Sequence, residues 1–208
     1  MKKHVILWLV FLGLMVGGVS RALANDGNPY DLLQSLADRM IASLKTNKTS
    51  LKTNPSVVYS LTYRIIVPHA DIAYMAKRVL PRNTWNNATP SQRDQFKDEF
   101  TKLLVSTYAS ALADYNNQTV KFYPVRGGYQ GKTNVSVRSQ IIRSDGPGVG
   151  VNYRLIFDGS VWKLYDISVE GVSLLESFRS QFADKLSTAA NMDDLIRELK
   201  QHNSRRGS

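Results

Sequence analysis

Two carboxylates and a serine flank Gly171 within residues 161–175, VWKLYDISVEGVSLL, and could form a catalytic corner. Asp166 and Glu170 are a candidate acid and base, and Ser173 lies two residues after a glycine, as a nucleophilic serine often does. On a strand, residues four apart place their carboxyl groups roughly 13 Å from each other, at about 3.3 Å per residue. Paired glycosidase carboxylates lie roughly 5 to 9.5 Å apart, so the spacing excludes a pair and leaves only a single acid or base.

Ser173 and His69, the other candidate catalytic residues, have simpler structural explanations. The second glycine of a nucleophile motif is missing, whereas Ser173 and Glu176 have the spacing of a helix capping box. His69 stands beside Pro68 and near Asp71, which favours a helix cap over a general base. The sequence has no cysteine, which excludes thiolate metal sites, disulfides and cysteine nucleophiles. We therefore expect no enzyme active site, no metal site and no cofactor.

The first 24 residues predict export from the cytoplasm. Residues 1–4 are basic, residues 5–19 are apolar, and Ala22-Leu23-Ala24 has the small-x-small pattern of a cleavage site. An uncleaved membrane helix is the alternative, but the apolar run is shorter than the roughly 20 residues that span a bilayer. We expect a signal peptide over residues 1–24, one periplasmic domain over residues 25–202 and a disordered tail over residues 203–208.

The charge of the chain is basic but dispersed. The formal net charge is +10, and cleavage after residue 24 removes three basic residues and no acidic one, which leaves +7. Because the basic residues are scattered, we expect a solvated surface that prefers anionic membranes, and no nucleic-acid partner. The remaining length suits one domain with one substantial core, and we expect this domain to be a monomer.

The first half of the mature chain has the pattern of helices. Apolar residues recur at helical spacing over residues 30–44, and prolines delimit shorter helices over residues 55–66 and 71–80. A Thr-Pro-Ser-Gln sequence at residues 89–92 is a strong start signal for a helix of about seven turns. The apolar face of this long helix carries Phe96, Phe100, Leu103, Leu104 and Tyr108.

The second half has the pattern of strands followed by helices. Four alternating segments, near residues 118–125, 132–143, 149–157 and 161–170, are separated by turns rich in glycine and aspartate. Short connections predict an antiparallel meander, followed by a helix over residues 172–186 and a last helix from Asn191 to about His202. The sequence therefore predicts an α+β fold in which helices pack on a curved antiparallel sheet.

The register of the last hairpin depends on its turn. A two-residue turn would pair Leu155 with Trp162, whereas a turn with a bulge would pair Leu155 with Val161. We predict the second register, because it gathers the apolar residues of both strands on one face. In this register Val161, Tyr165, Ile167 and Val169 join the apolar face, and Trp162, Asp166 and Glu170 lie on the opposite face.

The apolar face of the sheet and the apolar face of the long helix are expected to pack against each other. The simplest interpretation is a filled core. A pocket for acyl chains would have the same composition, because lipid tails and leucine side chains favour the same walls. Periodicity alone does not separate the two interpretations.

Several motifs carry a resemblance to a known family. The sequence WKxYDxxxEGVSL spans residues 162–174 and continues into FRSQF at residues 178–182. The sequence ATPxQRxxF at residues 88–96 and the final helix around residues 193–199 fit the same pattern, and Leu80-Pro81 departs from it where the family has Leu-Gly. Over nearly all of its mature length, the chain resembles the MlaC family of periplasmic phospholipid shuttles, also called toluene-tolerance auxiliary proteins.

This resemblance implies a non-enzymatic carrier of phospholipid that maintains the lipid asymmetry of the outer membrane. Its partners would be an outer-membrane lipoprotein–porin complex and an inner-membrane ABC transporter with a lipid-transfer ring. The family fold is an α+β cone of the nuclear transport factor type, which holds acyl tails between sheet and helices. A small exported enzyme on such a cone, and a periplasmic chaperone or lipoprotein carrier, are the alternatives.

The expected lining of the acyl-chain cavity combines the long helix with the apolar face of the sheet. The candidates are Phe96, Phe100, Leu103, Leu104, Tyr108, Val120, Phe122, Val135, Val137, Ile141, Val149, Val151, Tyr153, Leu155, Tyr165, Ile167 and Val169.

Overall fold

The computed structural model describes residues 27–51, 54, 56–113, 117–143, 146–188 and 191–206. The predicted signal peptide lies outside these residues. Within them, none of the helices combines the length and the apolar character that a bilayer crossing requires.

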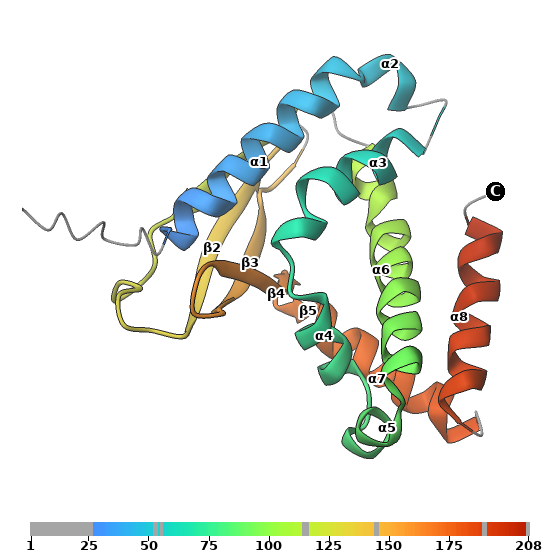
Figure 1. Cartoon of the computed structure of the whole chain (residues 1–208). Helices are drawn as coiled ribbons and strands as arrows, with labels where there is room; N and C mark the ends of the chain where they lie inside the picture. The colour runs from blue at the N-terminus through green and yellow to red at the C-terminus, as the bar shows by residue number, and fades with distance from the viewer. Residues whose placement is uncertain are drawn as a thin grey trace, which may run out of the picture.

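Helices precede and follow a five-stranded antiparallel sheet (Figure 1). The preceding helices are α1 (Pro29–Thr46), α2 (Lys48–Leu51), α3 (Ser56–Ile65), the 3₁₀ helix η1 (Val67–His69), α4 (Ile72–Val79), α5 (Arg82–Asn87) and α6 (Pro90–Ala113). The strands are β1 (Thr119–Tyr123), β2 (Asn134–Ile142), β3 (Val149–Phe157), β4 (Trp162–Val169) and β5 (Val172–Ser173). Helices α7 (Leu174–Thr188) and α8 (Met192–Arg206) follow. The predicted α+β class and meander are confirmed, whereas α2, η1, α5 and β5 were not predicted.

The predicted helix starts are confirmed by their caps. Asn28 accepts a hydrogen bond from the Tyr30 backbone N–H at 3.0 Å and starts α1. At the start of α6, Thr89 and Gln92 form a reciprocal capping box, with bonds of 2.9 and 3.2 Å. Such caps satisfy backbone N–H groups that have no partner within the helix.

Helix α8 extends further than predicted. It runs to Arg206, so residues 203–206 are helical and the predicted disordered tail is wrong for these residues. The side chain of Asn203 donates hydrogen bonds to the backbone oxygen and the carboxylate of Glu99 in α6, at 2.9 and 2.8 Å. This contact with a buried carboxylate fixes the last turns of α8, and short-range sequence patterns cannot predict it because the two residues are far apart in the chain.

The strands follow one another in sheet order β1-β2-β3-β4-β5. Cross-strand pairs place Val137 opposite Tyr153 and Val120 opposite Ile141, so the side chains predicted to share one face do so. We call this surface the apolar sheet face. From β1 to β3 it carries Val120, Phe122, Val135, Val137, Ile141, Val149, Val151, Tyr153 and Leu155.

The register predicted between β3 and β4 is wrong. Phe157 pairs with Trp162 across a four-residue loop, and Leu155 pairs with Leu164. The Asp158 carboxylate accepts hydrogen bonds from the backbone N–H groups of Ser160 and Val161, each at 2.9 Å, and these bonds stabilise the longer loop and lower the pKa of Asp158.

A bulge at Tyr165 then shifts the pairing within β4. Arg154 lies opposite Asp166 while Leu155 lies opposite Leu164, so Tyr165 is the extra residue. Because the four-residue loop pairs Phe157 with Trp162, Trp162 lies on the apolar sheet face, contrary to the prediction, and Val161 is exposed in the loop. Asp166 lies on the opposite, polar face, as predicted.

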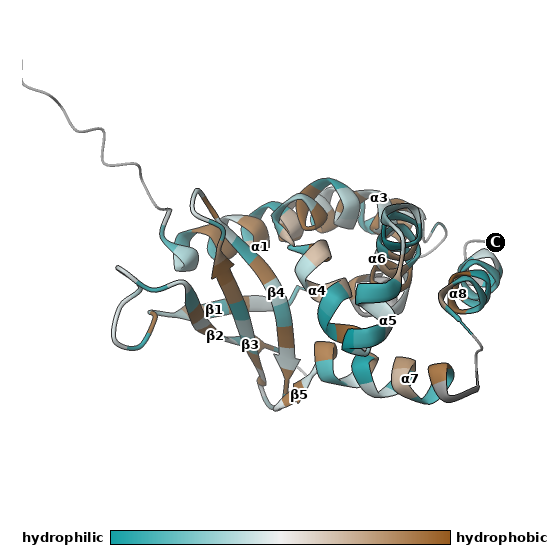
Figure 2. Cartoon of the chain, turned by 60° about the horizontal axis from the view of Figure 1, so that its bottom comes forward, coloured by the Kyte–Doolittle hydropathy of each residue, from teal (hydrophilic) through white to brown (hydrophobic). Residues whose placement is uncertain are grey.

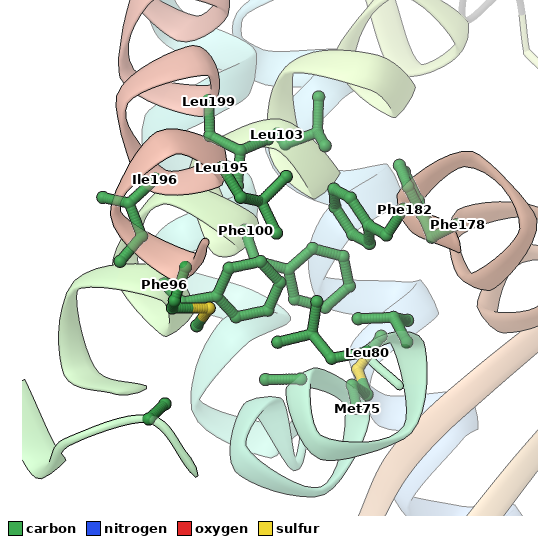
Figure 3. Close-up of a cluster of buried hydrophobic side chains, with 14 of the residues drawn as sticks. Met75, Leu80, Phe96, Phe100, Leu103, Phe178, Phe182, Leu195, Ile196 and Leu199 are labelled. Atoms are coloured by element: carbon green, nitrogen blue, oxygen red, sulfur yellow. The ribbon is translucent and has the colours of Figure 1, made fainter. Parts of the chain in front are cut away.

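The aromatic face of α6 does not pack on the sheet as predicted. Phe96 and Phe100 instead form a buried cluster with Phe178 and Phe182 of α7 and with leucines of α8 (Figure 3). The ring centroids of Phe100 and Phe178 lie 5.5 Å apart in an edge-to-face arrangement. Periodicity predicts that a helix face is buried, but it does not identify the partner.

The sheet is covered instead by α1. Leu33 and Tyr30 of α1 pack on the apolar sheet face, and the Tyr30 ring meets the Phe122 ring at a centroid distance of 6.3 Å. Figure 2 shows α1 along the sheet, with α7 and α8 on the far side of the molecule from β1. The protein therefore has an α1–sheet layer and a helical cluster of α4, α6, α7 and α8.

Candidate functional site

The polar residues of the WKxYDxxxEGVSL segment form a structural junction. The Asp166 side chain is buried, and its carboxylate accepts hydrogen bonds from the Ser173 hydroxyl at 2.7 Å and from the Leu175 backbone N–H at 3.0 Å. Arg154 lies 3.6 Å from the same carboxylate. Asp166 thus ties β4 to the first turn of α7, which explains these residues without catalysis.

Ser173 caps α7, as predicted. Its hydroxyl oxygen accepts a hydrogen bond from the Glu176 backbone N–H at 3.2 Å while the hydroxyl donates to Asp166. We expect Ser173→Ala to lower the free energy of unfolding by about 1–2 kcal/mol, measured by urea denaturation.

Ser177→Ala is the matched control. The Ser177 hydroxyl donates only to the Ser173 carbonyl one turn earlier in the chain, a local bond that contributes little to helix stability. An equal loss of stability in both variants would contradict the capping role of Ser173.

The other two candidate catalytic residues have separate surroundings. Glu170 has φ 47° in the turn between β4 and β5, and its carboxylate accepts a hydrogen bond from the Gly150 backbone N–H. His69 ends η1, where burial and then the charges of Arg39 and Lys163 lower its pKa. The helix cap in this region comes from Asp71, whose side chain accepts from the Tyr74 backbone N–H at 2.9 Å, so the cap predicted for His69 belongs to Asp71.

The apolar sheet face becomes progressively exposed towards one end of the sheet. The row Val135, Leu155 and Leu164 is buried under α1. In the row that crosses β3, β4 and β5, Val151 is buried, Val169 is 38% exposed and Val172 is 62% exposed. The face therefore has a closed end and an accessible end, which we call the open rim.

The predicted cavity residues divide into two sets by their burial. Side chains with little accessible surface pack mainly against protein atoms, whereas side chains that keep more surface are available to a ligand. The closed set is Phe96, Phe100, Leu103, Phe122, Val135, Val137, Val151 and Leu155. The accessible set is Leu104, Tyr108, Val120, Ile141, Val149, Tyr153, Tyr165, Ile167 and Val169.

A small pocket lies within the helical cluster. Leu103, Tyr108 and Phe178 are among the residues that line it, between α6, α7 and α8. Its volume of about 190 Å³ is smaller than the roughly 300–1,000 Å³ of pockets that hold drug-sized ligands. This pocket is too small for a molecule with two acyl chains.

Three tyrosines of the accessible set lie in apolar surroundings. Burial raises the pKa of Tyr153, and a 3.4 Å hydrogen bond from the Ser139 hydroxyl acts in the opposite direction. Burial also raises the pKa of Tyr108, and the negative charge of Asp166 adds to this effect. The pKa of Tyr165 is raised by burial and then by its neighbour Tyr74, whose ring centroid lies 5.0 Å away.

The raised pKa of Tyr153 predicts a loss of stability in alkali. Above pH 10.0, the ordinary value for tyrosine, the unfolded chain releases this proton while the folded protein still holds it. The free energy of unfolding should therefore fall as the pH rises through and above this value. Urea denaturation over a pH series should show this fall in the wild type and a shallower one in Tyr153→Phe, and identical slopes would contradict the assignment.

Two residues of the apolar sheet face were not predicted from the sequence. Trp162 and Leu164 pack with Leu155 and Leu33, although the predicted register placed Trp162 on the opposite face. Trp162 and Leu164 are apolar and Lys163 between them is charged, which indicates that even-numbered side chains face the core in the first part of β4. In the second part of β4, odd-numbered side chains face the core. A bulge between the two parts shifts the alternation by one residue, so both sets of side chains lie on the apolar sheet face.

The chain is similar in sequence to a known family and to proteins of that family. A family model described as MlaC protein matches residues 34–201. The toluene tolerance protein ttg2D of Pseudomonas putida is 31% identical over 163 residues, which cover 78% of this chain and 75% of the relative. The intermembrane phospholipid transport system binding protein MlaC of Haemophilus influenzae is 26% identical over 204 residues, 96% of this chain and 92% of the relative.

A solved structure has the same fold. The phospholipid-binding protein from Ralstonia solanacearum, in complex with a phospholipid, superposes with a TM-score of 0.80 and 32% identity, covering 88% of this chain and 100% of that chain. The MlaC family is periplasmic and consists of phospholipid-binding carriers rather than enzymes. The chain belongs to the MlaC family.

Proposed function

We propose that this protein is a periplasmic carrier that binds a phospholipid and moves it between membranes without catalysing a reaction. The similarity to a phospholipid-bound structure, over the whole length of that chain, is the main support. The burial of Asp166 as a helix-capping carboxylate agrees with a binding role, because it is engaged by Ser173 and Leu175.

The proposed tail site is the accessible part of the apolar sheet face. It includes Tyr153, Ile167 and Val169. Each buried methylene contributes about 0.8 kcal/mol, so even one tail along this face gives substantial affinity. The open rim at Val169 and Val172 would let a polar headgroup remain in water.

The proposed route of the protein follows from its family and from its first residues. Residues 1–24 would be removed as a signal peptide during export. An outer-membrane lipoprotein–porin complex and an inner-membrane ABC transporter with its lipid-transfer ring would then exchange lipid with the carrier. Phospholipid is the cargo, and its transfer would require no cofactor.

Lipid extraction tests this function directly. The mature protein, purified from a bacterial periplasm, should yield about one phospholipid per chain by mass spectrometry. It should also speed the transfer of labelled phospholipid between vesicles. The absence of both bound lipid and transfer would refute the proposal, and preferential competition by unfolded peptides would favour a chaperone instead.

A further inference from the structure

The polar face of the sheet is hollowed into a groove of about 680 Å³. Apart from Ser139 and Val151, the strand residues that line this groove have their side chains on the side of the sheet opposite the apolar sheet face. Gly150 leaves space in β3, where an added Cβ would lie 3.3 Å from the Glu170 carboxylate. Among the residues that line the groove are Tyr123, Arg138, Asn152, Arg154, Ser168 and Glu170.

Two arginines lie side by side in this groove. Arg138 of β2 is directly opposite Asn152 of β3, and Arg154 is two residues further along β3. Such diagonal neighbours lie about 7–8 Å apart at the backbone, within the reach of long side chains. Both guanidinium groups can therefore approach one ligand.

The guanidinium of Arg138 is available for a ligand. Among the residues that the structure describes, it has neither a hydrogen-bond partner nor an ion-pair partner. Arg154 lies 3.6 Å from Asp166 and its side chain remains 47% exposed. Because Asp166 already accepts bonds from Ser173 and Leu175, Arg154 keeps most of its five N–H donors for other contacts.

The remaining groups of the groove also favour an anion. Asn152 accepts a 2.7 Å hydrogen bond from Ser136 through its side-chain oxygen, so its amide N–H₂ group is left as a donor. The Glu170 carboxylate opposes an anion, but it is bound by the Gly150 N–H at the end of the groove. The groove therefore offers an anion two guanidinium groups and one amide as donors, against one carboxylate that repels it.

We propose that this groove binds a phosphate group, held by Arg138 and Arg154 with Asn152 as a neutral donor. A planar guanidinium donates two parallel hydrogen bonds to phosphate oxygens, which makes arginine well suited to this ligand. The phosphate comes either from a membrane lipid headgroup or from a free phosphate ester. This site lies beyond the proposed function, since the tails of the cargo would lie on the other face.

The test is a titration of the full-length mature protein with inorganic phosphate, followed by amide NMR. Amide signals of β2 and β3 around Arg138 and Asn152 should shift and saturate. Arg138→Ala and Arg154→Ala should each weaken binding about tenfold, since one charge-assisted hydrogen bond accounts for at least that factor. Arg126→Ala, which removes the same charge from an exposed loop between β1 and β2, should bind as the wild type does.

A second arm distinguishes the two sources of phosphate. Co-sedimentation with phosphatidylglycerol vesicles, compared with pure phosphatidylcholine vesicles, should fall in Arg138→Ala if the ligand is a headgroup. Equal sedimentation of both proteins, with phosphate binding still dependent on Arg138, would identify a free phosphate ester.

The proposal is overturned if the wild type shows no saturable shift, or if Arg126→Ala weakens binding as much as Arg138→Ala. Phospholipid extracted from the same variants should remain unchanged. A failure of this site is thereby distinguished from a failure of the carrier function.

Discussion

Phe100→Ala is expected to lower the free energy of unfolding by about 3–5 kcal/mol. The Phe100 ring is 0% exposed and contacts three other rings. It stacks on Phe96 at a centroid distance of 5.7 Å and meets Phe182 at 5.8 Å. Its removal would leave a cavity where α6 meets α7, because close-packed neighbours relax only partly. Urea denaturation measures this loss.

The same variant also tests the division of the predicted cavity residues. If Phe100 belongs to the filled core, the folded fraction of Phe100→Ala should retain its phospholipid. A variant with unchanged stability but with little bound lipid would show instead that Phe100 contacts the tails. Leu104→Ala, from the accessible set on the same helix, is the matched comparison, with the smaller effect on stability.

Val169→Asp is expected to reduce the bound phospholipid about tenfold or more. Val169 lies where the apolar sheet face reaches the open rim, opposite Val151 and Val172. A carboxylate there would have to lose water as a tail packs against it, a penalty of several kcal/mol, while each factor of ten needs only about 1.4 kcal/mol. Because Val169 is 38% exposed, the substitution should leave the fold intact. Extraction and mass spectrometry give the bound fraction.

Val161→Asp is the control for this experiment. Val161 is an equally sized, exposed residue in the loop between β3 and β4, outside the apolar sheet face. It should retain the wild-type amount of lipid. If both variants lose lipid equally, the effect comes from added negative charge and the tail site lies elsewhere.

The elements that could be predicted from the sequence are those fixed by local chemistry. Thr89 and Gln92 mark the start of α6 because their capping bonds involve only neighbours in the chain. That Val137 and Tyr153 lie on the same face follows from strict alternation along β2 and β3. The same reasoning identified Ser173 as a cap and not as a nucleophile.

The wrong predictions concern features that depend on contacts between residues far apart in the chain. The bulge at Tyr165 is favoured by burial on both sides of β4, with Leu164 against the α1 layer and Tyr165 against Tyr74. The aromatic face of α6 found its partners on α7 and α8, which follow it by many residues. Which apolar residues remain accessible is likewise a property of the packed molecule, so the seventeen cavity candidates could not be divided from sequence.

Because of the hydrogen bonds at Asp166, the hydrogen-exchange rate of one backbone amide should depend on whether lipid is bound. The Leu175 N–H donates to a carboxylate buried between the sheet and the helical cluster, so its proton exchanges with solvent only when α7 separates from β4. The exchange rate of this amide therefore measures the free energy of that opening. Because β4 also carries Ile167 and Val169 of the proposed tail site, a lipid packed there would stabilise β4 against this opening, and exchange at Leu175 should slow on loading and recover when the cargo is delivered.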